Sequence, residues 1–142
     1  MRFAGELQIY SEPKNGDRWY VEAVGQECFA GFIFAIIHLL QTNIVTAVSA
    51  NMLWQTALIA FTWVATVYWS YDRAGGSNNP AYGLTQPFVD LIDDGEDDAM
   101  RYTWIYVVCP IVGAFVAWII YEAIYKKAHE APIVGEPAVN KF

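Results

Sequence analysis

The chain has 142 residues, of which 56% are apolar and 16% are charged, and its formal net charge is −7. An ordinary soluble domain carries about a quarter charged residues, so this composition points instead to a membrane protein of one domain. The acidic balance, with no stripe of lysine and arginine, excludes a nucleic-acid-binding surface.

Residues 1–18 form a polar segment that carries Glu6, Glu12 and Asp17. A secretory signal places an apolar stretch directly after its basic start, and a transit peptide is poor in acidic residues. We therefore expect a polar N-terminal tail with neither signal. On that ground we expect an integral membrane protein of an energy-converting membrane, such as the mitochondrial inner membrane.

The first apolar segment covers residues 19–41 and has the length of about 20 residues that a helix needs to cross a bilayer. Glu22 and Glu27 lie in its opening turns, and His38 is the one ionisable residue between Phe29 and Leu40. A carboxylate inside a membrane is costly unless it is paired, which makes Glu27 a candidate functional residue. We expect His38 to be buried with its hydrogen bonds satisfied, and the alternative is a ligand or a pH sensor.

Two further segments, residues 52–71 and 102–122, are apolar over the same length. Aromatic residues mark several of their ends, as is usual at a membrane interface. The polar residues 126–142 then form a C-terminal tail. Three crossings would place the two tails on opposite sides of the membrane, and the lysine and arginine counts do not decide which side is which.

The connection between the second and third segments predicts a glycine-rich loop followed by a short helix. Asn79 can cap a helix through its side-chain oxygen, and Pro80 suits the first helical position. We expect this helix over about residues 79–87, with Pro87 ending it. A helix about 10–12 Å long cannot cross a bilayer of about 30 Å. The chain can enter the bilayer with this helix and return to the same side where protein or water shields its backbone.

These features resemble the second half of aquaporins and glycerol facilitators, the major intrinsic protein family. The family's opening helix carries an early glutamate, here Glu27. Its last helix has aromatic residues, a proline after a small residue, small packing residues and a terminal Tyr-Glu, which here are Trp104, Tyr106, Cys109, Pro110, Gly113, Ala114, Ala117, Tyr121 and Glu122. The resemblance covers Trp19 to Glu122. It implies an all-α membrane protein with three transmembrane helices and one re-entrant half-helix carrying Asn-Pro-Ala, over residues 19–125, in which Pro110 and Gly113 pack helices together.

The resemblance also implies roles for individual residues. Aquaporins consist of two inverted repeats whose half-helices meet at the membrane midplane, and this chain would supply one of them. Within the motif Asn79, Pro80 and Ala81, Asn79 would either donate a hydrogen bond to a passing solute or only cap the half-helix. Glu27 would hold backbone donors near the re-entrant loop.

The chain departs from the family pattern at the selectivity filter, which is the narrow part of the pore. The family's second half reads Asn-Pro-Ala-Arg, but Tyr82 stands at the arginine position. Val67 and Tyr68 occupy the neighbourhood where a filter histidine often lies. Selective water conduction is therefore in question, and the bulky Tyr82, Tyr68 and Trp69 could plug a channel.

The remaining polar features predict no catalytic chemistry. The acidic run over residues 90–98 is explained by a solvated loop at the membrane surface, or alternatively by a docking patch for a basic partner. Its spacing does not follow the EF-hand pattern. Cys28 and Cys109 are expected to be buried free thiols without metal-ligand spacing. Since no nucleophile–base pair or phosphate-binding loop occurs, we expect no enzyme activity, cofactor or metal.

Two functions follow, and the sequence favours the first. It is a structural, accessory subunit of a larger membrane protein assembly, because the filter is degenerate and half a pore leaves an uncovered edge. The alternative is half of a composite channel, homodimeric or heteromeric, for water or small neutral solutes. The expected partners are the lipid bilayer and other membrane subunits or a second half-repeat, and no nucleic acid.

Overall fold

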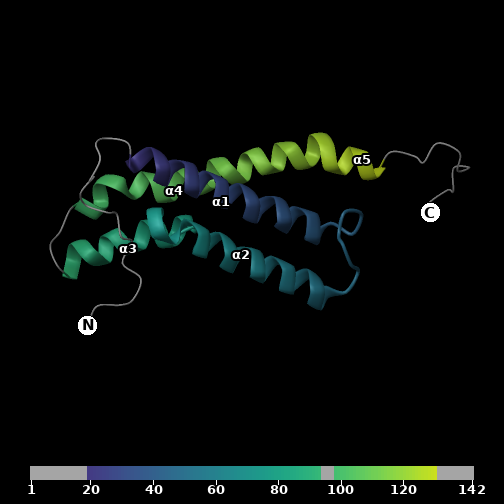
Figure 1. The fold of residues 1–142 in the computed structure, drawn as a ribbon, viewed down its shortest axis with the longest axis horizontal. Helices are drawn as coiled ribbons and strands as arrows, with labels where there is room; N and C mark the ends of the chain where they lie inside the picture. Colours follow the sequence, from purple (N-terminus) through teal and green to yellow (C-terminus); the bar gives the residue numbers. More distant parts are fainter. Residues whose placement is uncertain (1–18, 94–97, 131–142) are drawn as a thin grey trace, which may run out of the picture.

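The computed structural model of the chain describes residues 19–93 and 98–130, which form helices with no strand among them. The predicted all-helical fold class is therefore confirmed for these residues. The helices are α1 (Trp19–Thr42), α2 (Met52–Ala74), α3 (Pro80–Asp93), α4 (Asp98–Ile120), the π-helical turn η1 (Tyr121–Tyr125) and α5 (Lys126–Glu130). Figure 1 shows α1 and α4 running in the same direction, with α2 running in the opposite direction beside α1 and α3 confined to one half of the molecule.

Two of the helical stretches, Tyr20–Thr42 and Tyr102–His129, are long and apolar enough to cross a membrane. Helix α2 is also long enough, at 23 residues, but it does not reach the same apolarity because tryptophan, threonine and Gln55 interrupt its aliphatic residues. Two of the three predicted spans therefore meet both requirements, and the crossing by α2 stays a prediction.

Helix α1 is the centre of the packing, since it lies against both α2 and α4, and α3 packs on α4. The α1–α4 contact depends on glycine. A Cβ on Gly31 would lie 2.6 Å from the carbonyl oxygen of Pro110, and a Cβ on Gly113 would overlap the carbonyl oxygen of Cys28. Small residues allow such close backbone approach in membrane helices. Pro110 and Gly113 both lie at this contact, and their role in holding the helices together stays a prediction.

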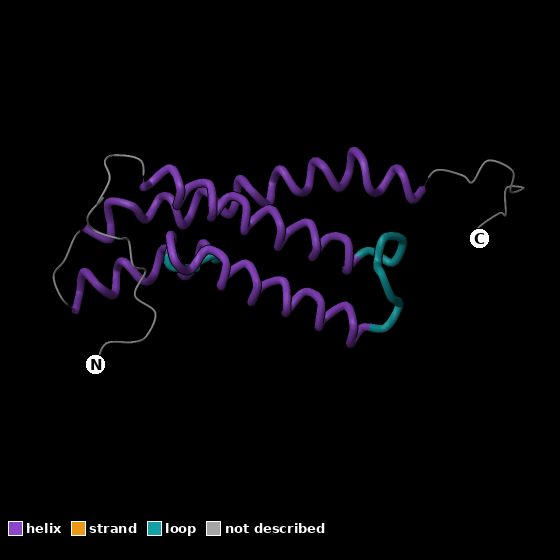
Figure 2. Tube along the Cα trace, in the orientation of Figure 1, coloured by secondary structure: helices purple, strands orange, loops and turns teal. Residues whose placement is uncertain are grey.

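Helix α3 begins at Pro80, as the sequence indicates, but it continues through Pro87 to Asp93. The predicted end near residue 87 is therefore wrong. Proline removes only one backbone donor from a helix, and the fully buried ring of Pro87 packs inside the protein. Fourteen residues give a length of about 21 Å, still short of a bilayer. Figure 2 shows that the loop before α3 reaches toward mid-molecule and that α3 then returns toward the end where α1 begins.

The boundaries of the third segment and of the acidic run also differ from expectation. Helix α4 begins at Asp98, and helical structure continues through η1 and α5 to Glu130, so residues 126–130 are not part of a tail. Because α3 extends to Asp93, the acidic residues are not wholly in a loop, and 94–97 lie outside the described residues. The predicted N-terminal tail and residues 131–142 lie outside them as well.

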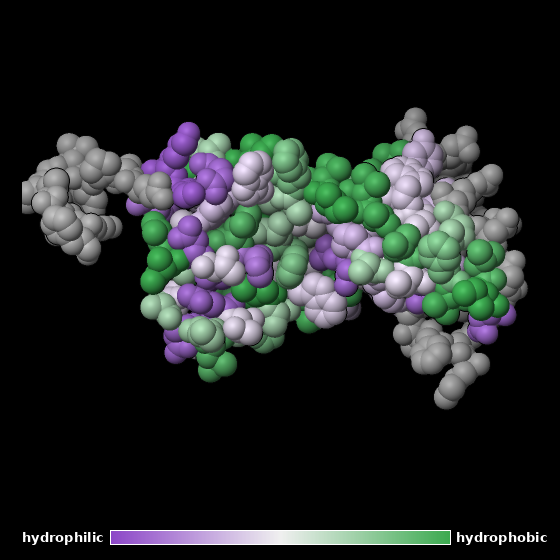
Figure 3. All heavy atoms as spheres, turned by 180° about the vertical axis from the view of Figure 1, so that it is seen from behind, coloured by the Kyte–Doolittle hydropathy of each residue, from purple (hydrophilic) through white to green (hydrophobic). Residues whose placement is uncertain are grey.

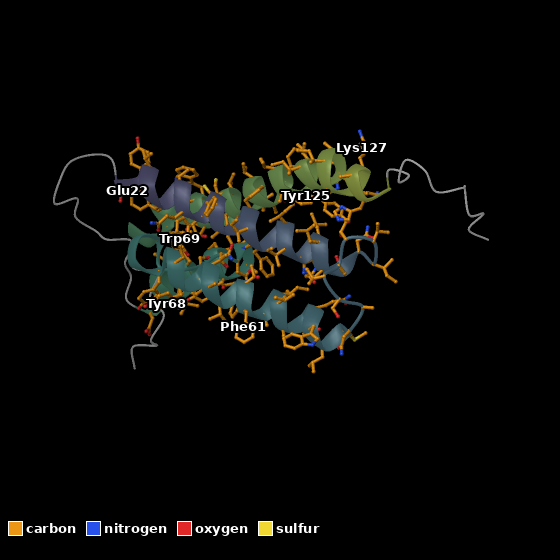
Figure 4. The ribbon with its side chains drawn as sticks, turned by 45° about the vertical axis from the view of Figure 1, so that its right-hand side comes forward. Glu22, Phe61, Tyr68, Trp69, Tyr125 and Lys127 are labelled. Atoms are coloured by element: carbon orange, nitrogen blue, oxygen red, sulfur yellow. The ribbon has the colours of Figure 1, made fainter. Side chains whose placement is uncertain are left out.

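The described surface is apolar along the helices and more polar at one end. Figure 3 shows hydrophobic residues across the middle, while hydrophilic residues gather at the end formed by α5 and the loop after α1. Figure 4 shows Phe61 and Tyr68 on the outer side of α2, and these side chains are 74% and 83% exposed. An outer surface of this kind suits contact with lipid.

Candidate functional site

The loop between α2 and α3 is anchored to α1 by Glu27. The Glu27 side chain is fully buried, and its Oε2 accepts a hydrogen bond of 2.9 Å from the backbone N–H of Asn78. The other carboxylate oxygen, Oε1, has no hydrogen-bond partner among the described residues. Glu27 therefore lies where the resemblance implies, holding a backbone donor of the loop that leads into α3.

The glycines before α3 turn the chain back onto α2. Gly75 ends α2 with φ 77°, and Gly76 follows with φ 69°. A Cβ on Gly76 would lie 2.7 Å from the carbonyl oxygen of Val67. Since residues with side chains rarely adopt positive φ, glycine at these positions permits both the turn and the close contact.

Asn78 ties the same loop to α2, a role that the sequence analysis missed. Its Nδ2 donates to Thr66 Oγ1 over 2.8 Å, and Thr66 Oγ1 donates to the carbonyl of Trp63 over 2.9 Å. Because the hydroxyl proton of Thr66 is used on Trp63, the hydroxyl can only accept from Asn78. The amide orientation of Asn78 is thereby set. Its φ of 38° is the one positive value outside glycine in the described residues. The feature of the sequence that could have indicated this role is the pair of asparagines directly before Pro80.

Asn79 caps α3 and still offers a donor. Its Oδ1 accepts from the backbone N–H of Ala81 over 3.0 Å, and its carbonyl accepts from the N–H of Gly83 over 2.9 Å. Because the side-chain oxygen is used in capping, the amide N–H groups are what Asn79 can present to a solute. The side chain is exposed. The two roles considered for Asn79 are therefore compatible.

Asn78, Asn79 and Pro80 lie at one side of an open groove of about 600 Å³, called the α1–α4 groove below. Most of the wall is apolar, and it draws on α1, α2, the start of α3, and α4. The lining residues are Gly31, Phe34, Ala35, His38, Leu39, Trp63, Asn78, Asn79, Pro80, Pro110, Ile111, Ala114 and Trp118.

His38 is exposed and lines this groove, so the expectation of a buried, satisfied histidine is wrong. The physical reason is the position of α3. That helix packs on α4 rather than on α1 and runs away from the groove toward the start of α1 (Figure 2), so it does not cover the face of α1 that carries His38.

The three bulky residues considered as a plug do not line the groove. Tyr82 is half-buried and packs against the core cluster that includes Ile105 and Tyr106. Tyr68 lies on the outer side of α2, as Figure 4 shows. Trp69 makes an edge contact with Phe29 of α1, with ring centroids 5.2 Å apart. The groove is therefore not obstructed by any of them.

The thiols and the polar groups outside the groove give no metal-binding cluster. Cys109 is buried and Cys28 partly buried, and both are free. No group of three or more histidine, cysteine, aspartate or glutamate side chains that could hold a metal occurs within residues 19–93 and 98–130.

Comparison with known proteins gives the family. The model for "Major intrinsic protein" matches residues 8–121, which is more than half of the chain. No curated protein and no solved structure matches. The match covers the Asn-Pro-Ala segment, the first apolar helix, the second apolar helix up to residue 121, and the residues that line the groove. This chain belongs to the major intrinsic protein family, and it is a channel-like membrane protein.

Proposed function

We propose that this chain forms one wall of a pore for water or small neutral solutes, and that a second three-helix unit supplies the opposite wall. The observation that carries the proposal is the α1–α4 groove, which is open and has Asn79 in its lining. One open groove is half of a conduit. A second unit, either another copy or a different chain of the family, would close it.

The chemistry of the groove suits neutral solutes. Asn79 offers amide donors, and the first N–H groups of α3 add the positive end of a helix dipole. Donors of this kind hold a water or hydroxyl oxygen and repel cations. The apolar remainder of the wall makes few hydrogen bonds. A solute can therefore leave as readily as it enters, which conduction requires.

The proposal is tested by permeability of vesicles that contain the purified full-length protein. We expect faster osmotic swelling under a water or glycerol gradient than in protein-free vesicles. The informative variant is Asn79→Asp, because aspartate keeps the oxygen that caps α3 but lacks the amide donors. We expect it to fold like the wild type and to lose the added permeability. Swelling equal to that of protein-free vesicles, or unchanged by Asn79→Asp, would argue against the pore.

A second candidate function is supported by Tyr82. This side chain packs into the core at the position where the resemblance places a filter arginine, so the filter would be degenerate. The chain would then serve as a structural, accessory subunit of a larger assembly, such as a complex of the mitochondrial inner membrane. Gentle detergent extraction followed by native gel separation distinguishes the two functions. Migration with several unrelated proteins, together with impermeable vesicles, would favour the structural role.

A further inference from the structure

We propose that Cys28 and Cys109 form a reactive dithiol, in which hydrogen peroxide or another small uncharged hydroperoxide joins the two thiols in a disulfide that links α1 to α4. The chain has two cysteines, and both are free thiols. The proposal assigns a modification site to this pair, and it does not depend on whether the α1–α4 groove conducts.

The two cysteines face each other across the contact between α1 and α4. Cys28 lies three residues before Gly31, which meets Pro110 of α4. Cys109 lies four residues before Gly113, where an added Cβ would overlap the carbonyl oxygen of Cys28. Residues at these spacings share one side of a helix, so both cysteines lie on the contacting sides. Cys109 belongs to the buried core cluster, Cys28 packs against that cluster, and the two thiols are in hydrogen-bonding contact.

The close approach of the two helices suits a disulfide. A disulfide joins Cα atoms that are about 4.4–6.8 Å apart. Facing residues of two helices come within that range where small side chains let the backbones approach each other. Gly31 and Gly113 provide such an approach about one turn after the two cysteines. The bridge therefore requires little movement of either helix.

The two thiols differ in exposure, which gives them different roles. Cys28 is half-buried, whereas Cys109 is 3% exposed. An oxidant therefore reaches Cys28 first, and Cys109 lies beside it as the thiol that completes the disulfide. Both cysteines lie on apolar helices, where a charged group is costly away from water. A small neutral hydroperoxide therefore suits this site better than a charged oxidant such as oxidised glutathione.

The reaction balances with hydrogen peroxide as the co-reactant. The sulfur of Cys28 attacks one peroxide oxygen, the O–O bond breaks, and the other oxygen leaves as water with the proton of the Cys28 thiol. Cys28 is then a sulfenic acid. The sulfur of Cys109 attacks the Cys28 sulfur, the S–O bond breaks, and the hydroxyl group leaves as water with the proton of the Cys109 thiol. Two thiols are thereby oxidised to one disulfide, and one peroxide is reduced to two waters.

The test treats the purified full-length protein in detergent with hydrogen peroxide. Mass spectrometry then follows the peptides that contain Cys28 and Cys109, so that oxidation of the three methionines is counted separately. In the wild type we expect both thiols to be lost together, in one cross-linked species that lacks two hydrogen atoms and that dithiothreitol returns to two thiols. In Cys109→Ser we expect dimedone to capture Cys28 as a sulfenic acid. In Cys28→Ser the buried Cys109 should keep its thiol.

Three results would overturn the proposal. The first is a wild-type protein that keeps both thiols, or that loses one of them without a bond to the other. The second is a disulfide that forms only between two chains, which a non-reducing gel shows as a covalent dimer. The third is loss of the Cys109 thiol in Cys28→Ser, because Cys109 would then react without Cys28. None of these measurements involves permeability, so they stand or fall separately from the proposed pore.

Discussion

The Glu27 carboxylate and the backbone N–H of Asn78 meet at 2.9 Å across 51 residues of sequence. This bond joins the third turn of α1 to the loop that positions Asn79 and the start of α3. The geometry of the groove edge therefore depends on a residue that does not itself line the groove.

Replacing Glu27 by alanine is expected to destabilise the protein by about 1–3 kcal/mol, because the buried N–H of Asn78 loses its acceptor. Glu27→Gln keeps one carbonyl oxygen and should cost less. Thermal unfolding in detergent, followed by circular dichroism, measures both. Equal stabilities for the two variants would show that the bond to Asn78 contributes nothing.

Gly113→Ala is expected to destabilise the protein by about 1–3 kcal/mol, because the added methyl group overlaps the carbonyl of Cys28 and forces α1 away from α4. Gly25→Ala is the matched control. Gly25 lies on α1, and a methyl group added there would meet no other atom within 4 Å. Alanine also favours a helix over glycine by about 0.5–1 kcal/mol. We expect a lower midpoint of thermal unfolding for the first variant and an unchanged or higher one for the second. The reverse order would contradict the close α1–α4 contact.

Thr66→Val is expected to loosen the loop before α3, because it removes the oxygen that accepts from Asn78 Nδ2. The expected loss of stability is about 1–2 kcal/mol, typical of a buried donor left without a partner. Thr62→Val is its control, since Thr62 lies one turn earlier on α2 and bonds only to the Leu58 carbonyl of its own helix. Hydrogen exchange at residues 75–79 should rise in Thr66→Val alone. Equal exchange in both variants would contradict a specific role for Thr66.

Tyr121→Phe is expected to cost about 0.5–1.5 kcal/mol, because the phenol shares a hydrogen bond of 3.3 Å with Thr46 in the loop after α1. Tyr125, which is labelled in Figure 4, lies about one turn later, and its side chain is 40% exposed. The matched variant Tyr125→Phe should leave stability within about 0.5 kcal/mol of the wild type. Chemical unfolding in detergent compares the two, and a larger effect at Tyr125 would contradict the bond to Thr46.

Much of the fold follows from simple patterns in the sequence. Long apolar segments predict the long helices, and Asn79-Pro80 predicts the start of α3, because a capping side chain and a proline without a donor suit a helix N-terminus. The end of α3 could not be predicted in the same way. Pro87 stops an isolated helix, but here its ring is buried by tertiary packing.

The site was only partly predictable for a similar reason. Glu27 and Asn79 stand out because their side chains are unusual beside apolar residues. The orientation of Asn78 depends on Thr66, twelve residues away, and on the hydroxyl bond of Thr66 to Trp63. The exposure of His38 depends on α3 packing on α4 rather than on α1. Both relations join parts of the chain that are distant in the sequence, so no residue spacing predicts them.

The π-helical turn at Tyr121–Tyr125 sets which way the end of the molecule faces. It holds one residue more than an α-helical turn, and one residue corresponds to about 100° of rotation. A regular α-helix with the same number of residues would turn Lys127 and His129 about 100° further around the axis. Deleting Ala123 would let α4 and α5 run as one regular helix with these two side chains facing in about the same direction as now. The turn thus absorbs one residue of chain length without redirecting the polar end of the protein.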